Sequence, residues 1–246
     1  MLTYYRDALY PQCNQTLLST ILDMQLLSQI TTRIRLYGSD CNQTALVLEA
    51  IKQTKTNIKV FPAIFVVDKD DAAYQRQKTA LQQALQTYGT DNILGITVGN
   101  EFMLNYILEN KATNANGTVG LAASALLKAK ITDIRQMLAS MSINLPVGTA
   151  DAGSYFNNDL LGAVDFGCVF ISQCLGTEVA DVFHPIQHVQ RARMVCWDDR
   201  PGRRNVDVHV LQGDQCGRGE RAHEQAADVH RRDGLADVLL DCRGED

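Results

Sequence analysis

This 246-residue sequence has neither a long apolar segment nor a strongly basic composition. No run of 18 or more apolar residues occurs, which excludes a transmembrane helix within the sequence. The formal net charge of −5 offers no basic surface of the kind that binds nucleic acid. Met1 is followed at once by Leu-Thr-Tyr, without a basic segment and apolar core, so we expect no signal peptide in the chain as written.

Metal and cofactor motifs are missing as well. Neither the Cys-x-x-Cys nor the His-Glu-x-x-His spacing of zinc sites occurs, and no Gly-x-Gly-x-x-Gly segment follows a predicted strand. We therefore predict a protein without a metal or other cofactor. We also expect a monomer.

Lysine, tyrosine and isoleucine disappear towards the C-terminus. Residues 1–190 contain eight lysines and five arginines, whereas residues 191–246 contain ten arginines and no lysine. The last tyrosine is Tyr155 and the last isoleucine is Ile186. A globular domain rarely loses its aromatic and β-forming residues at one boundary, so the composition predicts a poorly structured tail.

Short apolar runs alternate with segments of helical periodicity in the first 167 residues. The apolar runs, typical of strands buried in a parallel sheet, cover residues 2–5, 33–37, 58–67, 93–99 and 145–149. The predicted helices cover residues 17–29, 44–54, 73–88 and 119–141. On the first helix, the apolar face comprises Leu18, Ile21, Leu22 and Leu26. The pattern predicts an α/β fold, either an open parallel sheet or a (β/α)₈ TIM barrel, and the missing dinucleotide motif favours the barrel.

Features of secreted proteins occur in the first half. Three acceptor triplets for N-linked glycans begin at Asn14, Asn42 and Asn116. Cys13 and Cys41 are the only cysteines before Cys168. They could form a disulfide in an oxidising compartment, and two buried thiols are the alternative. We expect a secreted or cell-wall glycoprotein.

The most informative segment is Gly95-Ile-Thr-Val-Gly-Asn-Glu101, in which a buried strand ends in an amide and a carboxylate. At the C-terminal rim of a barrel strand, such side chains face the substrate site. Cleavage of a glycosidic bond needs a proton donor for the leaving oxygen, which Glu101 could supply, and a second carboxylate across the sugar. The alternative is structural: Glu101 could be the N-cap of the helix that follows, a role that Asn100 could also serve.

Three segments occur in a characteristic order and spacing: Ile34-Arg-Leu-Tyr-Gly38, Ile96-Thr-Val-Gly-Asn-Glu101 and Val147-Gly-Thr-Ala-Asp-Ala-Gly-Ser-Tyr155. With them, residues 1–167 resemble the fungal branch of glycoside hydrolase family 17. The resemblance implies a (β/α)₈ barrel that acts on β-1,3-glucan by a retaining mechanism, as an endoglucanase or glucanosyltransferase at the cell wall. It implies that Glu101 is the acid/base and that Asn100 bonds the sugar 2-hydroxyl. It also implies that Tyr37, Asp151 and Tyr155 bind the glucan. The alternative for each of the three is a packed or capping side chain.

The family pattern also requires a second glutamate, in a segment close to Ile-Ala-Glu-Thr-Gly-Trp-Pro that is missing here. When residues 229–237 are back-translated and read from the second base, they can encode Tyr-Ile-Ala-Glu-Thr-Gly-Trp-Pro. The glutamate codon then straddles those of Arg232 and Asp233. The same offset gives family-like sequence from residues 191–198 and 206–214.

The shifted frame can be followed back to His188. The segment before it, the 20 codons of residues 168–187 plus one base, is 61 nucleotides long and has the features of a short unspliced intron. We therefore predict a partial barrel of about five βα units at residues 1–167, a translated intron at 168–187 and a frame-shifted tail at 188–246. Such a chain would lack the nucleophile and be inactive. Two other functions stay open: a non-catalytic β-glucan-binding pseudoenzyme, and an unrelated α/β enzyme acting on β-1,4-linked substrates.

Overall fold

Strands and helices alternate along the computed structural model, which describes residues 1–171, 193–198 and 207–209. The first strands are β1 (Leu2–Tyr4), β2 (Arg33–Leu36), β3 (Lys59–Phe61), β4 (Ala63–Ile64), β5 (Ile96–Asn100), β6 (Val147–Ala152) and β7 (Phe166–Ile171). Between them lie the helices α1 (Leu17–Leu27), α2 (Gln43–Thr54), α3 (Asp71–Tyr88), α4 (Phe102–Glu109), α5 (Thr118–Ser140) and α6 (Asn158–Leu161). Two short 3₁₀ helices are η1 (Asp40–Asn42) and η2 (Gly153–Tyr155). The predicted α/β class is confirmed.

The strands from β1 to β7 pair in parallel and in sequence order, as β1-β2-β3 and β4-β5-β6-β7. The break between β3 and β4 falls at Pro62, which has no N–H group to donate. Backbone hydrogen bonds continue on both sides of it: the N–H of Thr97 donates to the carbonyl of Pro62, and that of Leu94 to the carbonyl of Val60, both at 2.9 Å. The resulting order is that of the strands in a (β/α)₈ barrel.

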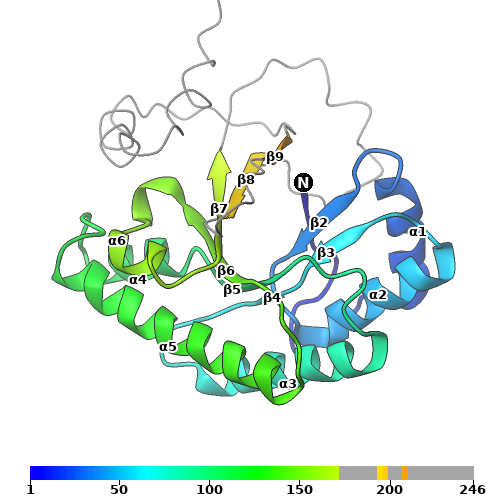
Figure 1. Ribbon diagram of the computed structural model, residues 1–246, viewed down its shortest axis with the longest axis horizontal. Helices are drawn as coiled ribbons and strands as arrows, with labels where there is room; N and C mark the ends of the chain where they lie inside the picture. Colours follow the sequence, from blue (N-terminus) through cyan, green and yellow to red (C-terminus); the bar gives the residue numbers. More distant parts are fainter. Residues whose placement is uncertain (172–192, 199–206, 210–246) are drawn as a thin grey trace, which may run out of the picture. The chain divides into compact units, whose positions relative to one another are not determined.

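The helices cover one face of these strands. In Figure 1, α2, α3 and α5 lie along the same side of the strands. The main hydrophobic core fills the space between them and includes Ile34 on β2, Val98 on β5 and Leu127 on α5. A smaller cluster on the opposite face of the strands includes Phe61 and Phe166, whose ring centroids lie 5.2 Å apart.

The barrel pattern stops after β7. The next described strand, β8 (Arg193–Asp198), pairs with β7 in the antiparallel direction, and β9 (Asp207–His209) pairs with β8 in the same way. A barrel would continue with a parallel strand. The predicted boundary at Gly167 lies inside β7. Most of the predicted intron, and the predicted tail apart from β8 and β9, lie outside the described residues.

Helix α1 corrects the predicted direction of its apolar face. Leu18 and Leu22 are 69% and 58% exposed. The buried side of the helix instead carries Thr20, Asp23, Met24 and Leu27. Of the predicted apolar face, only Ile21 packs against the core. Periodicity identified a leucine stripe, but it could not tell that two polar residues, Thr20 and Asp23, share the buried side with Met24 and Leu27.

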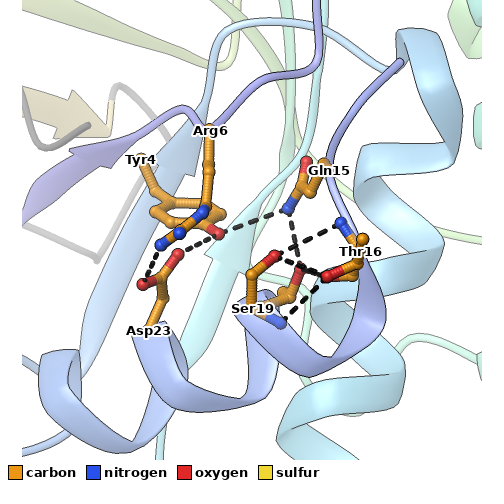
Figure 2. A network of polar contacts seen from close by, with 7 residues as sticks. Tyr4, Arg6, Gln15, Thr16, Ser19 and Asp23 are labelled. Carbon is orange, nitrogen blue, oxygen red and sulfur yellow. Dashed lines mark hydrogen bonds and ion pairs between the residues drawn. The ribbon is translucent and has the colours of Figure 1, made fainter. Parts of the chain in front are cut away.

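A network of polar contacts explains this orientation (Figure 2). The carboxylate of Asp23 accepts a hydrogen bond from the Tyr4 hydroxyl at 2.8 Å and forms an ion pair with Arg6 at 2.7 Å. The amide of Gln15 donates to the Tyr4 hydroxyl at 3.2 Å and to the Thr20 hydroxyl at 2.9 Å. Because buried polar groups need partners, these bonds fix the polar side of α1 against β1.

Cys13 and Cys41 form a disulfide, with their Cα atoms 5.0 Å apart. Of the two alternatives left open by the sequence, the disulfide is the one present. It joins the segment before α1 to the short helix η1. The bridge therefore ties together the loops that follow β1 and β2.

Removing the Tyr4 hydroxyl tests the buried network. In Tyr4→Phe, one oxygen of Asp23 loses its donor inside the protein, so we expect the free energy of unfolding to fall by about 1–3 kcal/mol. Tyr88→Phe is the matched control, because that hydroxyl bonds Glu49 at the surface and should contribute less than about 0.5 kcal/mol. Urea unfolding measures both, and equal losses would contradict the network's role.

Candidate active site

Strand β5 ends in a bulge that re-aims its last residues. Gly99 has a φ of +84°, and the register with β6 shifts just before Asn100. A Cβ atom on Gly99 would lie 3.0 Å from Leu127, so Gly99 faces the helices, as Val98 does. Two successive residues on one face are the mark of a β-bulge. Asn100 consequently turns towards the opposite face.

Glu101 follows directly in a left-handed backbone conformation, with φ 54° and ψ 31°. For a residue other than glycine this conformation costs about 1–2 kcal/mol. Backbone strain of this kind gathers at functional sites. Glu101 occupies the N-cap position of α4, yet its half-buried side chain makes no capping hydrogen bond. The carboxylate of Glu101 therefore does not cap α4.

Asp151 on β6 caps α4 instead. Its carboxylate accepts hydrogen bonds from the backbone N–H groups of Met103 at 2.8 Å, Leu104 at 3.3 Å and Ala152 at 2.9 Å. The side chain is fully buried and has no exposed surface with which to contact a sugar. Of the roles left open for Asp151, the geometry corresponds to the capping one, because the amides at the start of a helix need an acceptor.

Burial raises the pKa of Asp151 to about 7. The three backbone hydrogen bonds act in the opposite direction, and the negative charge of the nearby Glu101 adds to the rise. The two carboxyl groups therefore lie close enough to interact electrostatically.

Arg35 on β2 is a site residue that the sequence reasoning missed. Its guanidinium is fully buried and donates to Oδ1 of Asn100, through Nη1 at 3.1 Å and through Nη2. Burial lowers the pKa of Arg35 to about 10, against the opposing influence of Tyr37 and Glu101, so it keeps its charge at neutral pH. The available signal was a charged residue between Ile34 and Leu36 in an apolar strand.

Tyr37 lies beside Arg35, beyond the end of β2. The guanidinium carbon of Arg35 is 5.1 Å from the centroid of the Tyr37 ring, and Tyr5 packs edge-on against the same ring at 6.1 Å. Burial raises the pKa of Tyr37, with Arg35 lowering it and Glu101 raising it further. Tyr37, Asn100 and Glu101 are thus brought together around Arg35. Tyr155 is half-buried in η2 and packs against the main core.

A pocket of about 160 Å³ lies between α4 and the segment after β4, and Arg35, Tyr37, Asn100 and Glu101 are not among the residues that line it. Its lining includes the aromatic rings of Phe65, Phe102 and Tyr106 and the carboxylates of Asp68 and Glu109. The rings of Phe102 and Tyr106 lie 5.9 Å apart. This volume is below the roughly 300–1,000 Å³ that is usual for ligand pockets, so we assign no ligand to it.

No group of three or more His, Cys, Asp or Glu side chains in residues 1–171 and the two later strands could hold a metal ion. None of the helices in the described ranges combines the length and hydropathy that a membrane crossing requires.

A barrel-like parallel α/β fold with a glutamate at the end of an inner strand is an arrangement found in glycoside hydrolases. Residues 2–171 match the BtgE/BtgC glycoside hydrolase domain, and the chain belongs to this family. The match ends four residues after Gly167 and includes Asn100, Glu101 and Arg35.

Similar proteins carry names that point to β-1,3-glucan. The putative glucan endo-1,3-beta-glucosidase btgC of Aspergillus niger is 34% identical over 162 residues, which are 64% of this chain and 22% of that protein. The glucan 1,3-beta-glucosidase of Schizosaccharomyces pombe is 31% identical over 134 residues, 54% of this chain and 37% of that protein. An endo-laminarinase from Formosa Hel1_33_131 shares the fold, with a TM-score of 0.51 at 16% identity, over 68% of this chain and 48% of that one. The chain thus spans less than half the length of these proteins.

The Asp151 carboxyl predicts a dependence of stability on pH. Its pKa rises from 3.8 to about 7 on folding, so between these values the folded state holds a proton that the unfolded chain has lost. Stability should therefore fall as the pH rises from about 4 to about 7, by at most about 1.4 kcal/mol per pH unit. Asp151→Asn keeps an acceptor oxygen without a titrating proton and should flatten this fall, as measured by thermal unfolding from pH 4 to 8.

Asp159→Asn is the control for this experiment. The pKa of Asp159 is lowered by Lys128 and Ser124 at the surface, which is the opposite direction. That variant should keep the fall above pH 4. The same slope in wild type and Asp151→Asn would rule out a raised pKa at Asp151.

Proposed function

We propose that the chain is the first part of a domain that cleaves or transfers β-1,3-glucan, with Glu101 as its acid/base. The observation that carries the proposal is the position of Glu101. Glu101 follows the last residue of β5, next to Asn100 and near the charged Arg35. Its side chain does not cap α4. Membership of the glycoside hydrolase family and the names of the fungal relatives support the choice of substrate.

In the proposed reaction, Glu101 donates its proton to the glycosidic oxygen as the bond to the leaving sugar breaks. Asn100 would bind the 2-hydroxyl of the sugar. The bond from Arg35 to its Oδ1 supports this role, because it leaves the amide NH₂ as the group available to the sugar. Tyr37 beside Arg35 would line the same subsite. Tyr155 stays a second candidate subsite residue.

A retaining mechanism needs a second carboxylate about 5–5.5 Å from the first, to form the glycosyl-enzyme intermediate. Asp151 interacts with Glu101, but its oxygens are engaged by three backbone amides and it is fully buried. It is therefore unsuited to attack a sugar. We propose that the nucleophile is the glutamate encoded out of frame across the codons of Arg232 and Asp233.

Two observations support a retained intron after Gly167. The family match ends at residue 171, and the parallel order of strands gives way to antiparallel pairing after β7. With those 61 nucleotides removed, the remaining frame would supply the rest of a family 17 barrel. The expected location of the complete protein is outside the cell, at the wall, as the Cys13–Cys41 disulfide favours.

Activity on laminarin tests the proposed role of Glu101. The protein made from a coding sequence without the 61 nucleotides should hydrolyse laminarin or transfer its glucan chains, and should prefer it to cellulose. Glu101→Gln in that protein should lower kcat by about 10²–10⁴-fold. Glu49→Gln changes a partly exposed glutamate on α2 that bonds Gln53, and as the matched control it should leave kcat unchanged. Full activity of Glu101→Gln would exclude the assignment.

The 246-residue chain itself separates the proposal from the pseudoenzyme alternative. We expect the purified chain neither to turn over laminarin nor to be retained by insoluble β-1,3-glucan, because its cleft is incomplete. Retention without turnover would favour a glucan-binding pseudoenzyme, and turnover would contradict the missing nucleophile. Genomic DNA without a glutamate codon across Arg232 and Asp233 would contradict the frame shift.

A further inference from the structure

Two of the three acceptor triplets for N-linked glycans lie in a repeated tetrapeptide. Cys13-Asn-Gln-Thr16 and Cys41-Asn-Gln-Thr44 have the same sequence, and their cysteines form the disulfide. The first segment leads into α1 and the second into α2. Both glutamines are buried, and the side chain of Gln43 donates to that of Gln15 at 3.3 Å. We call these two tetrapeptides the paired segments, because a disulfide and a hydrogen bond join them.

The threonine hydroxyl of each paired segment is used inside the fold. Transfer of a glycan to asparagine requires the hydroxyl of the residue two positions later. The hydroxyl of Thr16 caps α1, where it accepts from the backbone N–H of Ser19 at 3.2 Å. Thr44 is buried, and its hydroxyl bonds that of Ser39 at 3.0 Å. The asparagines of both segments are exposed, but the hydroxyl that a transferase needs is already engaged.

The third triplet, Asn116-Gly-Thr118, is accessible over its whole length. Asn116 and Thr118 are both exposed. Gly117 between them has an extended backbone, with φ −78° and ψ 176°. The side chain of Asn157 anchors the loop by donating to the carbonyl of the buried Ala115 at 2.8 Å. An anchored loop between α4 and α5 thus presents both the acceptor and the hydroxyl to solvent.

We propose that Asn116 is the N-glycosylation site of this domain and that the paired segments keep Asn14 and Asn42 largely unmodified. The co-substrate is an oligosaccharide on a lipid diphosphate, with N-acetylglucosamine as its first sugar. The anomeric carbon of that sugar forms a bond to Nδ2 of Asn116 while its bond to the diphosphate oxygen breaks. Nδ2 gives up one proton to a base of the transferase, and nothing is oxidised or reduced. This inference rests on the extracellular location in the proposed function, and not on activity towards glucan.

The order of events during folding also favours Asn116. Cys13 and Cys41 are 28 positions apart, so the bridge can close while later parts of the domain are still being synthesised. Its closure removes the paired segments from the transferase at an early stage. Asn116 has no neighbouring cysteine and stays exposed in the folded chain. It is therefore a substrate both before and after folding, and a bulky glycan fits at the surface there.

Site occupancy measured by mass spectrometry tests the proposal. The 246-residue chain and the product of the coding sequence without the 61 nucleotides are each made in yeast behind an added secretion leader. Secreted and retained material is digested with a glycosidase that leaves a single N-acetylglucosamine on every modified asparagine. We expect Asn116 to be occupied in most molecules of both products, and Asn14 and Asn42 in a minority. Occupancy of Asn116 below that of either other asparagine, in either product, overturns the proposal.

Changes at Thr118 examine the acceptor itself. Thr118→Ala keeps the asparagine but removes the hydroxyl, so it should abolish occupancy of Asn116. Thr118→Ser keeps a hydroxyl and should retain the glycan. Asn144→Gln, which changes an exposed asparagine outside any acceptor triplet, is the matched control and should leave occupancy unchanged. Persistence of the glycan in Thr118→Ala would show that Asn116 is not its attachment point.

Opening the disulfide examines the paired segments. In Cys13→Ser/Cys41→Ser, occupancy of Asn14, Asn42 or both should rise towards that of Asn116, whose own occupancy should not change. Occupancies that stay low at both positions would overturn the protection by the bridge. Activity on laminarin is read separately. An active product with an unmodified Asn116 overturns this inference alone, and an inactive product that carries the glycan overturns the proposed function alone.

Discussion

The carboxylate of Asp151 holds the first amides of α4, and the position of Glu101 depends on this contact. Because Asp151 satisfies the start of the helix, Glu101 can occupy the N-cap position without using its own side chain there. The bulge at Gly99 supplies the turn that brings the chain to this point. The buried charge of Arg35 then fixes the amide of Asn100 from the other side. A structural carboxylate and a buried cation thus leave one carboxylate available for chemistry.

Much of the fold could be predicted because it depends on local patterns. The apolar runs and the helical periods located β1, β2, β5, β6, α2, α3 and α5 to within a few residues. One run, residues 58–67, is divided at Pro62, which is the residue least able to continue a ladder. The strand ending in Asn100 and Glu101 was also predictable, since an amide and a carboxylate directly follow an apolar run. Strand β7 was missed because the predicted end of the domain, at Gly167, falls within it.

The parts that the sequence left open or missed depend on contacts between residues distant in sequence. The leucine stripe of α1 was expected to face the core, but Asp23 reaches Tyr4 and Arg6 on the strand side and turns the helix over. Asp151 was indistinguishable from a subsite residue until the amides of α4 were seen around it. The role of Arg35 depends on Asn100, 65 positions away. Periodicity predicts which residues share a face of a helix. Which element that face packs against depends on residues elsewhere in the sequence.

The structure of the complete product with a bound oligosaccharide tests the role of Glu101 most directly. The protein would carry Glu101→Gln, to prevent turnover, and be crystallised with a laminari-oligosaccharide that spans the cleft. The account predicts that the amide of residue 101 lies about 2.6–3.2 Å from a glycosidic oxygen, with Asn100 at the 2-hydroxyl of the adjoining sugar. An oligosaccharide bound with residue 101 out of reach of every glycosidic oxygen would contradict it.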